Sequence, residues 1–414
     1  MIRPTAAEID VTALRGNLRS IRQYVSPAVE VIGIVKADAY GHGAVRVAQV
    51  LEQEHVRLLA VATPDEAVEL REHGISAEIL VLGDAPPDFV PYAAARNIAL
   101  TTVSQAQTAA LSAAAGHGVV RLHYNVDTGM GRAGVLADGA ARQILQGVSL
   151  PGARIVGIYS HFASAESDPA FSRLQAQRLA DVVEELRQGG FHPPMVHLAN
   201  SAGLLASRAY LHDAVRPGIL LYGCPPVPAD ACTVRPVLSL RTRIEIVKGL
   251  PAGHSIGYGR TFVASRSTHM ALLPIGYGDG YPRVLSNRAQ VIVRGHLAPV
   301  VGRISMDVCA IDVTDVPGAA AGDPVTLIGE QDGLRITADD LAALAAGFAD
   351  GHVALLLCHG GHLLSMNPRR AKAPSDGVSC PDPNRGRLLR HSACGPTSRP
   401  ESSVKRDAPY HTER

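Results

Sequence analysis

Short apolar runs alternate with longer amphipathic stretches over the first half of the chain. Each run is rich in Val, Ile and Leu, and the stretch after it has the period of a helix. This rhythm is typical of repeated βα units around a parallel sheet. Eight runs occur, at 31–36, 57–63, 78–83, 99–103, 119–126, 154–160, 195–199 and 213–216. Eight parallel strands predict an α/β fold, a closed (β/α)8 barrel of the TIM type.

The second half of the chain has a different pattern. After about residue 225, strands with alternating apolar positions follow one another between Gly turns, until Thr337 is expected to cap a helix. Within the first half, residues 169–188 have the apolar spacing of a helix, with Asp168 and a proline at its start. We therefore expect an N-terminal strand in 1–12 that joins the β domain, the (β/α)8 barrel over 13–225, and a mostly β domain over 226–345.

The composition excludes several classes of protein. Apolar residues make up 46% of the chain and charged residues 19%, and the net charge of +1 gives no electrostatic basis for binding nucleic acid or an anionic membrane. No apolar run approaches the ~20 residues of a membrane span, and the first residues lack the features of a signal peptide, so a cytoplasmic protein is expected. The six cysteines form no CxxC pair, which argues against a disulfide framework and against a metal site.

Lysine is rare in this chain. Only four of the 39 basic residues are lysines, at positions 36, 248, 372 and 405. Where arginine supplies almost all the positive charge, a retained lysine suggests chemistry that a guanidinium cannot perform, such as imine formation with an aldehyde. The alternative is an ordinary surface lysine. Lys36, however, stands at the end of the first strand run, where barrel enzymes build their active sites.

Polar residues also follow four other strand runs. Because the carboxyl ends of barrel strands meet at one mouth, these residues are expected to converge there with Lys36. They are Arg132 beyond Asp127 after the fifth run, His161 after the sixth, Asn200 and Ser201 after the seventh, and Arg216 after the eighth. Each alone has an ordinary explanation as a residue that satisfies loop backbone. Together they indicate a functional site.

The loops after the seventh and eighth runs have the composition of a phosphate site. In barrels a phosphate often lies there, against backbone N–H groups at Gly-rich turns. Ser201 can donate a hydroxyl, and Gly218 permits close approach of an oxyanion. A phosphate site opposite a strand-end lysine is the arrangement that pyridoxal phosphate requires, with Lys36 forming the Schiff base. Arg216, unless it forms a structural salt bridge, would face the pyridine nitrogen and weaken the electron sink, which suits a racemase better than a transaminase.

Several longer motifs occur together and in order. They are RPTAAEIDVTALRGNL at the start, VKADAYGHG at 35–43, DTGMGRAG at 127–134, SHFASAE at 160–166, HLANSAG at 197–203, RPGILLYG at 216–223, the IGYG segment around Tyr258 and GRISMD at 302–307. On these motifs, the chain from residue 2 to about residue 345 resembles the bacterial alanine racemases. The resemblance implies a pyridoxal 5′-phosphate-dependent enzyme that interconverts L-alanine and D-alanine and supplies D-alanine for peptidoglycan.

The resemblance also implies a homodimer that shares its active sites between subunits. Lys36 would hold the cofactor and move the Cα proton on the D-alanine side, and Tyr258 of the partner subunit would act on the L-alanine side. Two bases on opposite faces of Cα are what stereoinversion needs. The other implied roles are as follows: Tyr40, Ser201, Gly218 and Ile219 contact the cofactor phosphate, with Asn200 beside them; His161 and Arg216 tune Tyr258; Arg132 and the Met306 backbone bind the substrate carboxylate; Tyr277 narrows the entrance; Asn125 and Asp307 support these residues.

Two features depart from the family pattern. Asn125 stands two residues before Asp127, where many members have a lysine, often carbamylated, that orients the arginine matching Arg132. Here the amide, with or without a bound anion, would take that part. The same asparagine occurs in relatives of broader specificity, so a broader amino-acid racemase is an alternative.

The second departure concerns the end of the chain. From near residue 346 the periodicity is lost and the sequence becomes rich in Pro, Ser, Arg and Cys, which predicts an atypical, disordered tail over 346–414. The change resembles translation in a shifted reading frame. Loss of the family's closing strand is then expected to impair stability, dimerisation or activity.

Two other classes of function compete with racemisation. A non-catalytic pyridoxal-phosphate-binding protein would also have a barrel, but such proteins are single barrels, and the β domain with Tyr258 and Met306 argues against this class. An amino-acid decarboxylase of the same barrel type would need a different substrate constellation. The motifs around Lys36 and Arg132 do not favour it.

Overall fold

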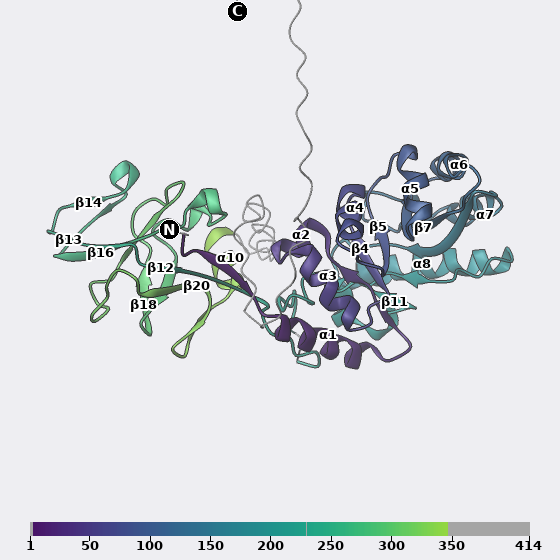
Figure 1. The fold of residues 1–414 in the computed structure, drawn as a ribbon. Coiled ribbons are helices and arrows are strands. Elements are labelled where there is room, and N and C mark those ends of the chain that lie inside the picture. Colours follow the sequence, from purple (N-terminus) through teal and green to yellow (C-terminus); the bar gives the residue numbers. More distant parts are fainter. Residues whose placement is uncertain (1–2, 229, 347–414) are drawn as a thin grey trace, which may run out of the picture. The chain divides into compact units, whose positions relative to one another are not determined.

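The computed structural model describes residues 3–228 and 230–346, which form an α/β barrel and a mostly β domain, as predicted (Figure 1). The predicted disordered tail falls, from residue 347 on, outside the described residues. In the part of the chain that the structure describes, no helix combines the length and the apolar character needed to span a membrane.

All eight apolar runs of the first half lie in one parallel sheet, whose strand order is β2-β11-β10-β9-β7-β6-β5-β4-β3. The strands are β2 Glu30–Val31, β3 Gly33–Ile34, β4 Leu58–Val61, β5 Glu78–Val81, β6 Ile98–Thr102, β7 Val120–Asp127, β9 Ala153–Tyr159, β10 Val196–His197 and β11 Ala214–Val215; the short β8 Val135–Leu136 pairs with β7 outside this order. Most of their residues are buried, which explains why the runs are continuously apolar.

The first barrel strand is split into two halves. β2 pairs with β11, the last strand, whereas β3 pairs with β4. Ile32, between the halves, donates its N–H to Val215 O at 2.9 Å, and Tyr222 Oη donates to Ile34 O at 2.7 Å. The split strand therefore joins both ends of the sheet, and the eight predicted runs give nine strand segments.

Helices lie outside the barrel strands (Figure 1). They are α1 Val11–Val25, α2 Lys36–Gly41, α3 Ala44–Gln53, α4 Pro64–Glu72, α5 Val90–Ala95, α6 Gln105–Ala114, α7 Ala140–Val148, α8 Pro169–Gln188 and α9 Ser201–Ala206. The predicted helix 169–188 is confirmed as α8, and Asp168 caps it by accepting the N–H of Phe171 at 2.9 Å. In α1, apolar residues recur every three or four positions and pack on the barrel core: Leu14, Leu18, Ile21 and Val25.

The second domain is built from antiparallel strands around its own apolar core. One sheet has the order β1-β12-β20-β17-β18 with β21 on β20, a second has the order β13-β16-β19, and β14 pairs with β15. The elements are β1 Ala6–Ile9, β12 Leu238–Arg243, β13 Ile246–Leu250, β14 Ser255–Ile256, β15 Phe262–Val263, β16 Thr268–Leu273, β17 Gln290–Val293, β18 His296–Pro299, β19 Cys309–Asp312, β20 Pro324–Gln331, β21 Leu334–Ile336 and α10 Ala338–Ala346. Thr337 caps α10 as predicted, since its Oγ1 accepts the N–H of Asp340 at 3.0 Å.

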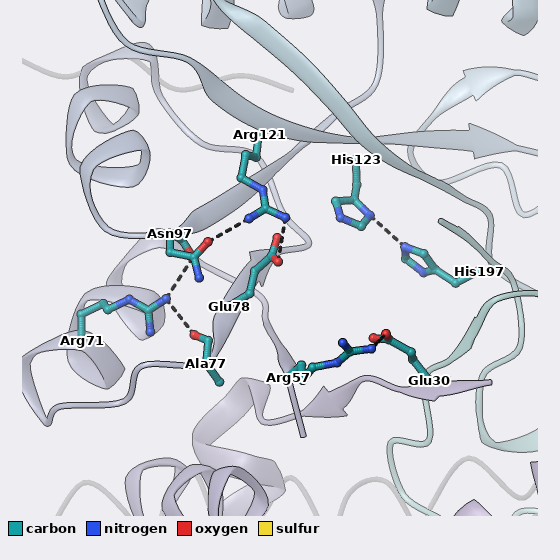
Figure 2. A network of polar contacts seen from close by, with 9 residues as sticks. All are labelled: Glu30, Arg57, Arg71, Ala77, Glu78, Asn97, Arg121, His123 and His197. Carbon is teal, nitrogen blue, oxygen red and sulfur yellow. Dashed lines mark hydrogen bonds and ion pairs between the residues drawn. The ribbon is translucent and has the colours of Figure 1, made fainter. Parts of the chain in front are cut away.

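Ion pairs join the amino-terminal ends of the barrel strands (Figure 2). Arg57, before β4, pairs with Glu30 at the start of β2. Arg121 of β7 pairs with Glu78 of β5 at 2.8 Å and donates to Asn97 Oδ1 at 2.9 Å. Such partly exposed pairs each add little stability, so their main effect is to fix how neighbouring strands align at this end. The polar residues of the predicted site follow the opposite, carboxyl ends.

Candidate active site

Lys36 follows the first barrel strand but is not part of it. β3 ends at Ile34, and Lys36 opens α2, in which residues 37–40 all have left-handed backbone angles, with φ of 51–55° and ψ of 36–52°. The sequence predicted a strand through residue 36; that end point is wrong, because the strand stops at Ile34. None of the four residues is glycine, and the left-handed helix costs about 1–2 kcal/mol per residue, so contacts from the rest of the fold must impose this turn.

The surroundings of Lys36 favour its neutral amine. Burial is the main cause that lowers the Lys36 pKa. The positive charges of Arg132 and Arg216 lower this pKa further. The carboxylate of Glu66 acts in the opposite direction, and Lys36 Nζ lies 5.9 Å from the centroid of the Tyr40 ring. Because a neutral amine is the form that adds to an aldehyde, Lys36 is suited to carry a cofactor of that kind.

Arg216 is a buried cation whose partners are neutral. Its guanidinium donates to the carbonyl oxygens of Ser160 at 2.6 Å and of Leu198 at 3.0 Å. None of the ion pairs among the described residues includes Arg216, so the structural salt bridge considered as its alternative is not found there. Burial lowers the pKa of Arg216 to about 10, which still leaves the guanidinium charged at neutral pH.

Three histidines extend from this arginine into the barrel: the half-buried His161 and the buried His197 and His123. Arg216 Nη2 lies 3.2 Å from His161 Nδ1, and Arg216 Nη1 lies 2.5 Å from His197 Nδ1. His197 Nε2 in turn lies 3.0 Å from His123 Nδ1 (Figure 2). Burial is the largest cause that lowers all three pKa values, to about 3 for His161 and His123, and the charge of Arg216 adds to it. The three rings are therefore neutral, and those of His161 and His197 can offer a nitrogen lone pair to the guanidinium.

The residues predicted to surround a phosphate come from α2, α9 and the loop after β11: Tyr40, Ser201, Gly218 and Ile219. Gly218 lies against Tyr40, because a Cβ built on Gly218 would lie 2.5 Å from Tyr40 Oη. Ser201 Oγ accepts the N–H of Leu220 at 3.2 Å, which joins α9 to the loop. Asn200 caps α9, since its Oδ1 accepts the N–H of Gly203 at 2.9 Å. The loops after strands β10 and β11 thus lie together, as the sequence predicted.

Arg132 lies on an exposed loop that Asp127 shapes. Asp127 Oδ1 accepts two N–H groups of this loop, at 2.8 and 3.1 Å. The charge of Arg132 lowers the pKa of His161 as well as that of Lys36, so this charge lies near both residues. Asn125 is buried in β7.

Two residues outside the predicted set fix the backbone of the site loops by hydrogen bonds. Glu66 of α4 accepts the N–H of Ala37 at 2.6 Å. Gln175 of α8 is fully buried; it accepts the N–H of Ala163 and donates to His161 O, both at 3.0 Å. Glu66 is itself the last residue of a capping-box pattern that begins at Thr63, but this pattern marks only the start of a helix. Gln175 is one polar residue within an amphipathic helix and gives no such signal.

Three glycine-containing segments of the β domain lie against one another: HSIGYGRTF at 254–262, PIGYGDGYPR at 274–283 and GRISMD at 302–307, which contacts both of the others. Backbone N–H groups of the Tyr277 turn donate to the carbonyl oxygens of Ser305 at 3.0 Å and Met306 at 2.8 Å. A Cβ on Gly302 would lie 2.6 Å from a backbone carbonyl oxygen of the Tyr258 segment. The close packing of these backbones leaves no room for side chains at such positions and brings the predicted β-domain residues onto one surface.

Three large side chains of this surface are exposed: Tyr258 by 69%, Tyr277 by 37% and Met306 by 57%. Arg3 ties the surface together from the start of the chain. Its guanidinium donates to Asp279 Oδ1 at 2.9 Å and to the backbone carbonyl of Asp307. The predicted site residues therefore fall into a barrel group and a β-domain group, and no hydrogen bond or ring contact found among the described residues joins Tyr258 to Lys36.

Comparisons with known proteins agree on one family. Residues 9–226 match the model of the alanine racemase N-terminal domain, and residues 237–359 match that of the alanine racemase C-terminal domain. The second match extends past residue 345, where the sequence resemblance was expected to end. The chain is 42% identical over 348 residues to alanine racemase 2 of Caldanaerobacter subterraneus subsp. tengcongensis, covering 82% of this chain and 89% of that one.

Further relatives give the same result. The alanine racemase of Halothermothrix orenii is 42% identical over 350 residues, with 83% of this chain and 92% of the relative covered. Among solved structures, that of alanine racemase from D-cycloserine producing Streptomyces lavendulae superposes with a TM-score of 0.82 at 31% identity, covering 91% of this chain and 98% of that one.

Proposed function

The chain belongs to the alanine racemase family of isomerases, and on this premise we propose that it interconverts L-alanine and D-alanine with pyridoxal 5′-phosphate held on Lys36. The observation that carries this proposal is the placement of Lys36. Its amine is partly buried beside two arginines, Arg132 and Arg216. Tyr40, which packs against Gly218, lies on the same turn.

The residues at this end of the barrel fit the cofactor. The Tyr40 hydroxyl and the bare backbone of Gly218 offer a place for a phosphate near the Ser201 hydroxyl. Arg216 would face the ring nitrogen and, because its guanidinium keeps its proton, would donate to that nitrogen without protonating it. When bound, the cofactor supplies an electron sink that makes the Cα–H bond of alanine acidic.

Two groups of the protein would hold the Cα proton in turn, one on each face of the substrate. The Lys36 amine would take or return it on the D-alanine side, and Tyr258 of the partner subunit would do so on the L-alanine side. His161 and Arg216, 3.2 Å apart, would set the proton affinity of that tyrosine. The remaining residues would bind and orient the substrate. Arg132 and the Met306 backbone would contact its carboxylate, supported by Asn125 and Asp307. Tyr277 would narrow the entrance to the site.

A homodimer with shared sites is part of the proposal. Tyr258 is 69% exposed, and large neighbouring side chains on the same surface are also exposed. Exposed groups of this kind are typical of surfaces that bind another chain. A second copy would cover them and bring Tyr258 to Lys36. We further propose that the enzyme works in the cytoplasm and that its D-alanine serves peptidoglycan synthesis, in keeping with its family.

The direct test incubates the purified chain and added pyridoxal phosphate with L-alanine and, separately, with L-serine, and quantifies the D-isomers. We expect D-alanine to form and the cofactor to produce an absorbance band that Lys36→Ala abolishes. D-serine at a comparable rate would favour the broader specificity suggested by Asn125. Cofactor absorbance without any D-isomer would overturn the racemase proposal in favour of a cofactor-binding protein.

Sharing of the site between subunits has its own test. Lys36→Ala and Tyr258→Phe chains are each expected to be inactive alone. When the two are unfolded together and refolded, a mixed dimer would contain one site with an intact lysine and an intact tyrosine, and activity would return. Two inactive variants that stay inactive after mixing, while wild type refolded in the same way regains activity, would contradict a shared site.

A further inference from the structure

We propose that Glu66 is a positioning residue for Lys36: its carboxylate anchors the left-handed turn that follows the lysine and places a negative charge opposite two arginines. This inference rests on the proposed function in one respect, the role of Lys36 as the cofactor-bearing amine. The contacts themselves concern only residues of the described chain.

The turn from Ala37 to Tyr40 needs an external anchor. Its four residues have φ values between 51 and 55°, a region that side-chain-bearing residues rarely occupy in succession. Such conformations persist where surrounding contacts over-determine them. The far end of the turn is held by Asp38, whose Oδ1 accepts the N–H of Ala44 at 2.7 Å, and by the His42 ring, whose Nδ1 lies 3.0 Å from two carbonyl oxygens of the turn.

Glu66 holds the near end of the turn. Its Oε1 accepts the N–H of Ala37, the residue after Lys36, at 2.6 Å. Its Oε2 accepts the N–H of Ala62 at 2.6 Å and that of Thr63 at 3.1 Å, at the end of β4 and the start of α4. One carboxylate therefore links the first amide of the strained turn to the neighbouring strand, and its own position is fixed by the capping box of α4.

The same carboxylate is the negative charge near Lys36. Charged groups face this amine from three elements: Glu66 from α4, Arg132 from the loop after β7 and Arg216 from the loop after β11. The Tyr40 ring faces it from α2. Burial and both arginines disfavour the protonated amine, and Glu66 favours it. Lys36 lies near two guanidinium groups, so it needs such a counter-charge if its amine is to accept the Cα proton. Glu66 therefore supports proton transfer by Lys36 as well as fixing its position.

The test uses Glu66→Gln, which keeps the shape but removes the charge and one of the two acceptor oxygens, and Glu66→Ala, which removes both acceptors and so the whole anchor. Glu69→Gln, an exposed residue one turn further along α4, is the matched control. Acetylation of the cofactor-free full chain with acetic anhydride is followed by peptide mass spectrometry as a function of pH. Only four lysines are present, so Lys36 is resolved easily, and the exposed Lys248 is an internal reference.

We expect the charge-removing Glu66→Gln to raise the acetylation rate of Lys36 relative to Lys248 about threefold where the amine is mostly protonated, as loss of a nearby counter-charge predicts. Hydrogen exchange of the Ala37 amide should accelerate at least tenfold in Glu66→Ala. Unchanged Lys36 reactivity in Glu66→Gln, or unchanged Ala37 exchange in Glu66→Ala, would overturn the inference. Neither measurement needs racemase activity, so a wild-type chain that makes no D-alanine would refute the proposed function and leave this test valid.

Discussion

Replacing Gly218 by alanine tests the proposed phosphate site directly. A Cβ at this position would lie 2.5 Å from Tyr40 Oη and 3.2 Å from Tyr40 Cζ, and the first of these distances is too short to persist. The backbone at Gly218 is not in the left-handed region, so alanine itself is tolerated there and the conflict is purely with the tyrosine. Tyr40 is only 7% exposed, so its ring cannot simply turn into solvent. Overpacking of this kind costs about 1–3 kcal/mol, which corresponds to roughly 5- to 150-fold weaker cofactor binding if it falls on the phosphate site.

The assay is a pyridoxal phosphate titration of Gly218→Ala, followed by absorbance. The double variant Gly218→Ala with Tyr40→Phe lacks the clashing oxygen. Its loss of cofactor-binding free energy should therefore be smaller than the sum of the losses in the two single variants. Gly16→Ala is the control, since a Cβ on Gly16 in α1 meets no atom within 4 Å. It should leave the cofactor Kd unchanged and raise stability by about 0.5–1 kcal/mol. An unaltered Kd in Gly218→Ala, or strict additivity in the double variant, would refute the packing argument.

Three further outcomes follow from the structure. Gln175→Leu should destabilise the chain to urea by about 1–3 kcal/mol, because the half-buried backbone groups of Ala163 and His161 lose their partner, whereas Gln177→Leu on the exposed side of the same helix should change little. Arg3→Ala should raise the KM for alanine and also lower Tm, because it leaves the buried Asp279 carboxylate without its cationic partner; a normal KM would mean that the Tyr277 and Met306 turns do not need this ion pair. Burial lowers the pKa of His42 to about 4, so the unfolded chain takes up this proton first and stability falls as pH drops from 6.5 toward 4. His42→Asn should remove up to about 1.4 kcal/mol per pH unit of that fall in urea unfolding, and an identical pH slope in both chains would show that His42 does not contribute.

The barrel could be predicted from the sequence because its strands are buried on both faces, and each of the eight apolar runs contributes to the sheet. The strand-end residues could be grouped for a related reason: parallel strands bring their carboxyl ends to one mouth. This places Lys36, His161 and Arg216 together without any knowledge of the contacts between them. The family motifs then added Tyr258, which no periodicity connects to the barrel.

The turn after Lys36 could not be predicted in this way. The residues A-D-A-Y contain no glycine, and their local preference is for an extended or right-handed backbone. Their left-handed form depends on bonds from Glu66 and from Ala44, and such tertiary contacts leave no local pattern. The buried histidines His123 and His197 were missed because each lies inside a strand run, and nothing in the sequence shows that the two rings meet there.

The split first strand sets the order in which this protein can be completed during synthesis. β2 and β3 leave the ribosome early, but the partner of β2 is β11, Ala214–Val215, which emerges only when the barrel sequence is almost finished. Tyr222, which bonds to Ile34, follows later still. Until then a nascent chain has neither the closing seam nor Arg216, whose charge helps to lower the Lys36 pKa in the complete barrel. Binding of the proposed cofactor would therefore be a late event in biogenesis, coupled to closure of the barrel rather than to the appearance of the lysine.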